Sequence, residues 1–336
     1  MRVLFRVDAS DVIGGGHWLR CLVLAEEVLL QGGEVQWCYV STAPALLQRL
    51  QHLDIPSSQL VVERAGAEDA QQTRDLAEQW GADWLIVDGY HFSADYRAQL
   101  RSLNYRLMVV DDLNDSGQMQ ADAVLNTTLY ASELVYQPAS LDVLAGADFV
   151  LLSRSYTQSH HVPFQQRTHL FVNFGASDAA GLTLPALQLL AASGINFPVM
   201  VVTGPAMRQH EQVAQLCQRH GFEHRHDVPS LYPVLNQCRL ALTAAGSTLH
   251  ELACLGVPSI FMVVADNQLR SAQAHQQHGW CIWFDGRSAG GLDDAVGMVK
   301  HWWEGVELDQ RSEKARQLID GMGAGRVVQY LRSEVQ

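Results

Sequence analysis

A glycine-rich segment with one histidine, residues 8–17 (DASDVIGGGH), lies between the first predicted strand and the helix after it. Its glycines let the backbone approach a ligand closely, and the helix start offers free N–H groups to an anion. His17 stands at that helix start, where the positive dipole end disfavours the protonated ring. We therefore expect a neutral imidazole that acts as a general base. The alternative is that His17 only caps the helix or packs against it.

The same segment holds two carboxylates that are candidates to orient this histidine, Asp8 and Asp11, and the sequence does not decide between them. The segment differs from the common nucleotide-binding loops. No glycine completes a G-x-G-x-x-G pattern, and no Gly-Lys-Ser/Thr is present. A dinucleotide or ATP site is therefore disfavoured, and a nicotinamide-dependent oxidoreductase is the least favoured of the enzyme classes we consider.

A second small-residue turn feeds a helix start at residues 244–251 (AAGSTLHE). After Ala245 and Gly246, the hydroxyls of Ser247 and Thr248 can add donors to the backbone N–H groups that bind a diphosphate. Glu251 lies one turn into the helix, where its carboxylate can accept two ribose hydroxyls. Thr248 and Glu251 also have the spacing of a capping box, so the alternative is that Glu251 only holds the helix N-terminus.

Two further polar loops follow predicted strands. Asn267 and Gln268 come after a strong apolar run, and their amides suit the hydroxyl or acetamido groups of a sugar. Residues 173–178 (NFGASD) place Gly175, Ser177 and Asp178 where they can contact phosphate or sugar. For both loops the alternative is an ordinary polar connection.

A strand-end segment in the first half of the chain, residues 88–91 (DGYH), places Tyr90 where we expect the substrate sugar, together with Gly16 of the histidine loop. The adjacent carboxylates Asp111 and Asp112 end the next strand. We predict that they are solvated and bind no metal, because no third hard ligand has a recognisable spacing.

Short apolar runs alternate with helical patterns along the whole chain, which predicts parallel sheets with crossover helices. The predicted strands are residues 3–7, 35–40, 84–87, 107–110 and 123–125, then 170–172, 198–202, 240–242, 258–264 and 280–284. Ligands of such sheets bind beyond the carboxyl ends of the strands, which is where the motifs above lie. The fold class is α/β, with two Rossmann-like domains that face each other across a cleft.

The expected domain organisation is an N-terminal Rossmann-like domain over residues 1–155 and a C-terminal one over residues 165–310. A polar stretch, residues 155–168, joins them. Residues 311–336 are expected to form a C-terminal helix that packs back on the N-terminal domain.

Composition narrows the partners. The 336 residues carry 36 Asp and Glu against 23 Lys and Arg, a net charge of −13. An acidic chain repels phosphate backbones and anionic bilayers, so we expect neither nucleic acid nor stable membrane association. The six cysteines form no C-x-x-C pair, and no signal peptide is recognisable. These features favour reduced thiols in a cytoplasmic protein.

Taken together, the motifs resemble those of a known enzyme family. The matching residues are 6–10 (RVDAS), 13–17 (IGGGH), 20–22 (RCL), 87–90 (VDGY), 111–112, 126, 174–178, 245–251, 265–268 (ADNQ) and 320–327. They resemble the UDP-2,4-diacetamido-2,4,6-trideoxy-β-L-altropyranose hydrolases of pseudaminic acid biosynthesis, the PseG family. That family is similar in fold to GT-B glycosyltransferases such as MurG.

The resemblance implies that the second domain binds UDP, that the first domain supplies His17, and that the reaction needs neither a metal nor a cofactor. The expected reaction is hydrolysis with inversion at the anomeric carbon: His17 deprotonates a water, and the helix start at Ser247 and Thr248 stabilises departing UDP. The runner-up is a GT-B glycosyltransferase that uses a UDP-sugar and a soluble acceptor. A nucleotide-sugar-binding regulator without catalysis is a further alternative. We expect a monomer or a weak homo-oligomer.

Overall fold

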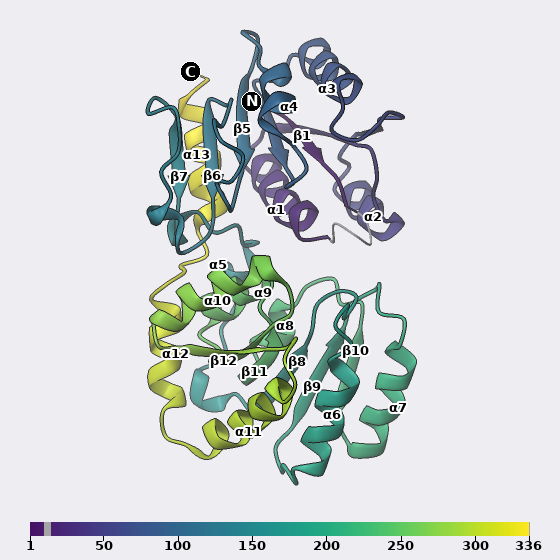
Figure 1. Cartoon of the computed structure of the whole chain (residues 1–336), viewed down its shortest axis with the longest axis vertical. Coiled ribbons are helices and arrows are strands. Elements are labelled where there is room, and N and C mark those ends of the chain that lie inside the picture. Colours follow the sequence, from purple (N-terminus) through teal and green to yellow (C-terminus); the bar gives the residue numbers. More distant parts are fainter. Residues whose placement is uncertain (10–14, 336) are drawn as a thin grey trace. The chain divides into compact units, whose positions relative to one another are not determined.

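The computed structural model describes residues 1–9 and 15–335, which form two compact units (Figure 1). Unit 1 comprises Met1–Ser153 and the C-terminal segment from Gly321, and unit 2 comprises Arg154–Asp320. The predicted joining stretch belongs to unit 2, where it contains α5 (Ser155–Gln158) and η3 (Phe164–Gln166).

Unit 1 is built on one parallel sheet of seven strands in the order β3-β2-β1-β4-β5-β6-β7. The strands are β1 (Arg2–Val7), β2 (Glu34–Tyr39), β3 (Ser57–Gln59), β4 (Trp84–Asp88), β5 (Arg106–Val110), β6 (Ala123–Asn126) and β7 (Asp142–Ala145). The helices are α1 (Gly16–Leu30), α2 (Pro44–His52), α3 (Ala67–Trp80), α4 (Ala94–Leu100) and α13 (Gly323–Ser333), with 3-10 turns η1 (Ala131–Glu133) and η2 (Ala147–Phe149).

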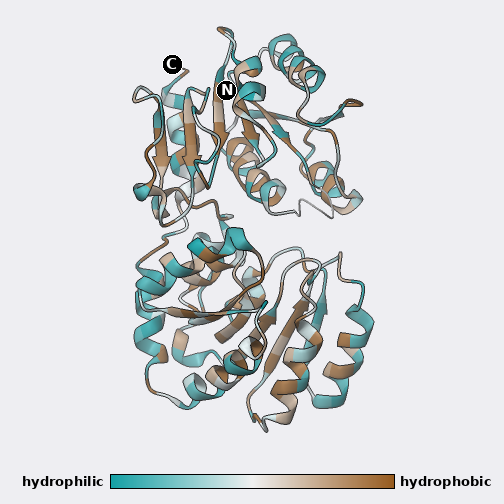
Figure 2. Cartoon of the chain, viewed as in Figure 1, coloured by the Kyte–Doolittle hydropathy of each residue, from teal (hydrophilic) through white to brown (hydrophobic). Residues whose placement is uncertain are grey.

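The core of unit 1 follows from the apolar pattern of its elements. All five residues of β4 are buried, as expected for a central strand covered on both faces. Helix α1 buries Trp18, Cys21, Ala25 and Val28, a stripe at helical spacing. Figure 2 shows strands that are mostly hydrophobic and helices that are hydrophobic on part of their surface only.

The C-terminal helix α13 belongs to unit 1. Its Val327, Val328 and Leu331 join the same apolar core as α1. The helix starts at Gly323, where a Cβ would lie 2.3 Å from the Val150 carbonyl oxygen, so only glycine lets the chain enter here. Residues 311–336 were expected to pack on the N-terminal domain as a whole. Their first part instead belongs to α12 (Leu308–Arg316), which lies in unit 2.

Unit 2 has a parallel sheet of six strands in the order β10-β9-β8-β11-β12-β13. The strands are β8 (His169–Asn173), β9 (Val199–Thr203), β10 (Glu223–His226), β11 (Cys238–Ala244), β12 (Ser259–Val263) and β13 (Cys281–Asp285). The remaining helices are α6 (Thr183–Ala192), α7 (His210–His220), α8 (Tyr232–Leu235), α9 (Thr248–Leu255), α10 (Asp266–Gln277) and α11 (Gly291–Glu304). Each unit is therefore a doubly wound α/β sheet.

All six cysteines are free, and five of them are buried. Within the described residues, no helix is both long and apolar enough to cross a bilayer.

Candidate active site

His17 and Asp88 meet at the point where the unit 1 sheet changes direction. From β1 the chain winds outward through β2 and β3 and then returns to β4 on the other side of β1. The carboxyl ends of β1 and β4 are therefore adjacent, and their connections run to opposite faces, the position at which doubly wound sheets bind ligands. His17 lies in the first turn of α1, after β1, and Asp88 is the last residue of β4.

The contact between these side chains determines the state of the imidazole. His17 Nδ1 lies 2.8 Å from Asp88 Oδ1, and because a carboxylate only accepts hydrogen bonds, this contact favours the neutral tautomer with its proton on Nδ1. The basic nitrogen is then Nε2, which makes no hydrogen bond with any residue that the structure describes. His17 retains 8% of its surface exposed, whereas Asp88 retains 1%. This is the arrangement of an oriented general base.

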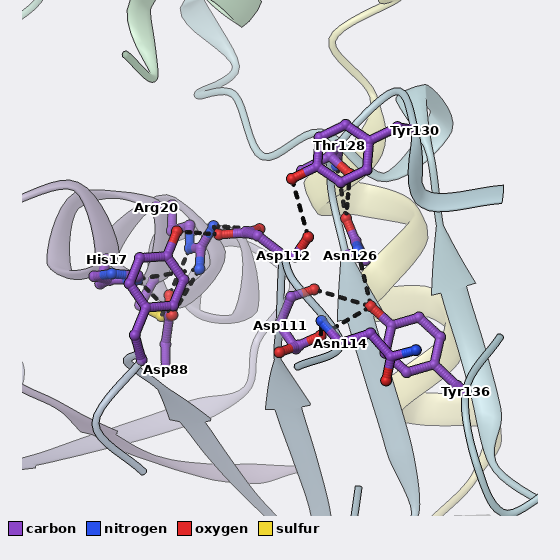
Figure 3. A network of polar contacts seen from close by, with 12 residues as sticks. His17, Arg20, Asp88, Asp111, Asp112, Asn114, Asn126, Thr128, Tyr130 and Tyr136 are labelled. Carbon is purple, nitrogen blue, oxygen red and sulfur yellow. Dashed lines mark hydrogen bonds and ion pairs between the residues drawn. The ribbon is translucent and has the colours of Figure 1, made fainter. Parts of the chain in front are cut away.

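Arg20, one helical turn after His17, keeps Asp88 ionised (Figure 3). Its Nε and Nη2 donate to the two Asp88 oxygens at 2.6 and 2.7 Å, a bidentate pair. The Cys21 thiol donates a further hydrogen bond to Asp88 Oδ2 at 3.3 Å. Burial alone would raise the pKa of Asp88, but Arg20 and His17 outweigh it and hold that pKa well below its usual range.

Asp112 receives the third nitrogen of Arg20 and also holds Tyr90. Arg20 Nη1 donates to both Asp112 oxygens, at 2.9 and 2.8 Å, and the Tyr90 hydroxyl donates to Oδ2 at 2.9 Å. The prediction that Asp111 and Asp112 are solvated is wrong: both are buried, because side chains from other elements bind them. No group of three or more His, Cys, Asp or Glu residues in the described ranges could hold a metal ion.

Tyr90 lies beside His17. Its ring meets the His17 ring edge-on, with 4.6 Å between the centroids, and about half of its surface, 51%, is exposed. Burial of its hydroxyl and the neighbouring Asp112 carboxylate raise the pKa of Tyr90 well above its ordinary value. Because the hydroxyl is bound to Asp112, the part of Tyr90 left to meet a ligand is the ring.

The carboxylate that orients His17 is Asp88 and not Asp8. Asp8 is fully buried, accepts the backbone N–H groups of Val40 and Ser41 at 2.7 and 3.0 Å, and pairs with Arg6 at 2.9 Å. It also contacts His91 Nε2 at 3.2 Å. Its oxygens thus tie the ends of β1 and β2 together. The other candidate, Asp11, lies outside the described residues.

Gly16, the first residue of α1, stands directly before His17. A Cβ at this position would meet no described atom within 4 Å. The space beside Gly16 is therefore not occupied by packing within the part of unit 1 that the structure describes.

In unit 2, the turn between β11 and α9 presents small residues. Gly246 and Ser247 are exposed, Thr248 is half-buried, and Ala245 donates its N–H to Met262. β11 neighbours β8, and the connections from these two strands diverge, so this turn lies at the switch point of the second sheet. Helix α9 begins at Thr248, and its first turn offers backbone N–H groups to an anion.

Glu251 is bound by a residue far from it in the sequence. The Tyr156 hydroxyl of α5 donates a hydrogen bond to Glu251 Oε1. Burial raises the pKa of Glu251 to about 7, against the opposing effect of hydrogen bonds from Tyr156 and Thr248. The N-cap of α9 is Ser247, and no side chain caps it, so a capping box between Thr248 and Glu251 does not describe this helix.

Two more of the predicted contact residues have structural partners. Asp178 accepts the N–H groups of Leu182 and Thr183 at 2.9 and 2.8 Å and so ties its loop to the start of α6. Gln268 Oε1 accepts the N–H of Val264 at 3.0 Å, which ties the first turn of α10 to the end of β12.

Three of the predicted residues stay exposed at this edge of unit 2. Gly175, with φ of 93°, and Ser177 are exposed after β8, and Asn267 is exposed on the first turn of α10. These residues follow strands of one parallel sheet, so they share its carboxyl edge with the β11 turn.

Sequence reasoning did not include Arg20, Asp88 and Asp112 among the site residues. A signal for Arg20 was its spacing from His17, because residues three apart share a helix face. Asp88 and Asp112 carried a weaker signal, a carboxylate where a buried strand ends. Neither signal identifies the partner of each group.

Comparison with known proteins supports a common architecture. No protein-family model matches the chain. An uncharacterised protein of Methanocaldococcus jannaschii is 21% identical over 80% of this chain. The match covers 57% of that protein's length. A protein of Campylobacter jejuni named UDP-2,4-diacetamido-2,4,6-trideoxy-β-L-altropyranose hydrolase is 22% identical over 76% of this chain and 89% of its own.

The solved structures give the fold. MurG of Acinetobacter baumannii matches with a TM-score of 0.70 at 15% identity, covering 99% of this chain and 100% of its own. A structure described as the glycotransferase of kitacinnamycin matches with a TM-score of 0.66 at 14% identity, covering 100% and 99%. The chain therefore has the fold of the GT-B glycosyltransferases, built from two parallel-sheet α/β domains of seven and six strands.

Proposed function

We propose that the protein is a nucleotide-sugar hydrolase that releases UDP from UDP-2,4-diacetamido-2,4,6-trideoxy-β-L-altropyranose, as a step of pseudaminic acid biosynthesis. The observation that carries this proposal is the His17–Asp88 pair, in which the carboxylate directs the basic Nε2 away from itself. The relative from Campylobacter jejuni supports the substrate class, because its name states this reaction. The GT-B fold supports a sugar-nucleotide enzyme more generally.

In the proposed step, His17 Nε2 takes a proton from water as the water oxygen attacks the anomeric carbon. The bond from that carbon to the diphosphate oxygen breaks, and its electron pair leaves with UDP. Attack on the face opposite to UDP inverts the anomeric carbon. The products are UDP and the free sugar, and the proton held by His17 is later returned to solvent.

The groups around His17 carry opposite charges that are nearly balanced. Arg20 carries one positive charge against the two carboxylates Asp88 and Asp112, so the cluster is negative by one charge while the imidazole is neutral. Protonation of His17 brings the cluster to neutrality. Because the groups are already oriented by their mutual hydrogen bonds, they do not have to reorganise during the proton transfer.

We assign UDP to unit 2. The exposed turn at Gly246 and Ser247 and the N–H groups of the first turn of α9 suit the diphosphate. Glu251 suits the ribose, since Tyr156 binds one of its oxygens and a second acceptor oxygen belongs to the same carboxylate. Asn267, Gln268, Ser177 and the ring of Tyr90 are proposed to contact the sugar or phosphate.

The test is a proton NMR time course of the purified protein with this UDP-sugar, with EDTA and without an acceptor. We expect UDP and free sugar to appear together, with the inverted anomer formed first. Retention of configuration, or loss of turnover in EDTA, would contradict the proposed chemistry. Turnover only after a sugar acceptor is added would show a glycosyltransferase, in which the same base deprotonates an acceptor hydroxyl.

A further inference from the structure

Among the residues that the structure describes, Asp112 is the one carboxylate with hydrogen bonds to both Arg20 and Tyr90, the two neighbours of the His17 ring. It follows β5, and its side chain is almost fully buried. On one side it binds Arg20, whose Nη1 lies 2.9 and 2.8 Å from the two oxygens. On the other side it accepts the hydroxyl of Tyr90 at 2.9 Å. Asp112 itself makes no hydrogen bond with His17.

Asp112 controls where Arg20 lies. A guanidinium is planar, so contacts on two of its edges fix both its position and its plane. One edge, Nε with Nη2, faces Asp88, and the remaining nitrogen faces Asp112. Arg20 Nη2 also lies only 3.1 Å from His17 Nδ1. A small displacement of Arg20 would therefore change the hydrogen-bond partners of both Asp88 and His17 Nδ1.

Asp112 also places the ring of Tyr90. The Tyr90 ring meets the His17 ring edge-on, a contact that involves no hydrogen bond. The hydroxyl of Tyr90 donates its hydrogen bond to Asp112, which fixes the position of the ring. The same carboxylate thus determines the position of the aromatic neighbour and of the cationic neighbour of the base.

A second polar cluster lies on the side of Asp112 away from Arg20 and binds the backbone there (Figure 3). The Tyr130 hydroxyl donates to the Asp112 backbone carbonyl at 3.1 Å. The carboxylate of the preceding Asp111 accepts the Tyr136 hydroxyl at 3.0 Å and the Asn114 N–H at 2.8 Å. Asn126 donates to the oxygen of Tyr136 at 2.8 Å.

The side-chain oxygen of Asn126 is also hydrogen-bonded. Its Oδ1 accepts both the backbone N–H and the hydroxyl of Thr128, at 2.9 and 2.7 Å. The donors and acceptors of this cluster are thus engaged with one another, which makes it a support for the backbone at 111–112 and not a ligand site.

We propose that Asp112 is a positioning residue that acts on the general base through Arg20 and Tyr90. The inference rests on the proposed role of His17, but its structural consequence is measurable without catalysis. Asp112 keeps Arg20 on Asp88, and the fixed Asp88 keeps the His17 proton on Nδ1 and the lone pair on Nε2.

The variant Asp112→Asn separates these contacts from simple burial. Because Arg20 Nη1 touches both oxygens, either orientation of the new amide places an NH₂ group against a donor. Arg20 must then move, although the side-chain volume is unchanged. We expect the fraction of His17 in the Nδ1–H tautomer to fall. The measurement is long-range ¹H–¹⁵N NMR of the imidazoles, with the His17 signals assigned by their loss in His17→Asn.

The kinetic readout is kcat and KM for the UDP-sugar. We expect Asp112→Asn to lower kcat on the order of 100-fold, because misplacement of an oriented group by about 1 Å costs that much, with a smaller change in KM. Tyr90→Phe, which removes only the hydroxyl from a half-exposed ring, gives a milder loss of kcat. In the double variant, Tyr90→Phe should cause no further loss of kcat beyond that of Asp112→Asn, since the two residues act through one contact.

The matched control is Asp122→Asn, which breaks another Asp–Arg pair of unit 1, with Arg101 at 2.8 Å, before the start of β6. We expect it to lower Tm and to leave the tautomer population unchanged. An unchanged tautomer population in Asp112→Asn overturns the proposal, whatever happens to kcat. So does an equal tautomer change in Asp122→Asn. If the wild-type protein releases no UDP, the proposed function fails while the tautomer result still decides the role of Asp112.

Discussion

The carboxyl edges of the two sheets use their polar residues differently. In unit 1, the side chains of His17, Asp88, Arg20 and Asp112 form a continuous network, buried except for part of Arg20, that ends at one basic nitrogen. In unit 2, Asp178 accepts N–H groups at the start of α6, and Gln268 accepts the Val264 N–H at the end of β12. The predicted contact residues left exposed there are small or neutral: Gly175, Ser177, Gly246, Ser247 and Asn267.

We propose that this difference reflects a division of chemical work between the two units. A proton is moved by a titratable side chain whose orientation and charge are controlled, and unit 1 contains one. A diphosphate is bound by N–H groups that need little more than small residues and a helix start, and unit 2 contains those. The two sheets share a fold, so the residues after the strands and not the topology create the distinction.

The comparison predicts that the largest loss of turnover follows from one atom of unit 1. Asparagine at position 17 keeps a donor that can reach Asp88 but has no counterpart of Nε2. We expect His17→Asn to lower kcat by about 10²–10⁴-fold. UDP affinity, measured by calorimetry, should stay within severalfold of wild type, because the nucleotide is assigned to unit 2.

The control for this variant is His91→Gln, which changes the other carboxylate-bound imidazole of unit 1. It should affect Tm more than kcat. Near-normal turnover of His17→Asn, or an equal loss in His91→Gln, would remove His17 from the mechanism.

An intermediate effect is expected at Glu251. If this carboxylate binds ribose, Glu251→Gln should weaken UDP binding by about tenfold to a hundredfold, the range for a hydrogen bond to a charged group. Wild-type UDP affinity should then rise with pH through the Glu251 pKa of about 7, and the variant should lose this dependence. A lowered Tm with unchanged UDP affinity would instead show a purely structural role.

The same group predicts the pH dependence of stability. The folded-state pKa of Glu251, raised by burial to about 7, lies above the 4.5 of an unperturbed glutamate, so the folded protein binds the proton more tightly. This contribution to stability is fully present below pH 4.5 and is lost as the pH rises to about 7. Thermal melts across this range should show a smaller decline in Glu251→Gln than in wild type.

The smallest effects are expected in the loop after β8. Asp178→Ala removes the acceptor of two backbone N–H groups at the start of α6 and should cost about 1 kcal/mol of unfolding free energy. Ser177→Ala, beside it, changes an exposed hydroxyl and should leave the melting curve unchanged while weakening UDP-sugar binding by a fewfold. Equal effects of the two variants on Tm would contradict the assignment of Asp178 to structure and Ser177 to the ligand.

Much of the fold could be predicted from apolar patterns. The ten predicted strands all exist. Nine of them are central strands, which are buried on both faces and therefore hydrophobic throughout, and the tenth, β13, is an outermost strand with an apolar sequence. The three strands that the sequence did not indicate, β3, β7 and β10, are outermost or short and polar, such as the exposed Ser57–Gln59. At a sheet edge, a strand can pair through its backbone without an apolar sequence pattern, so the sequence does not reveal it.

The sequence by itself determined that the chain forms doubly wound α/β units and that His17 begins a helix after the first strand. Both follow from local spacing: apolar residues repeat at strand or helix periods, and glycines precede the histidine. Only the tertiary structure decided which carboxylate holds His17. Asp8 is nearer in sequence, but sheet order places β4 beside β1 and brings Asp88 to the imidazole across 71 residues. Hydrogen bonds and charge act over a few ångströms of space, so such partners are chosen by topology and cannot be read from separation along the chain.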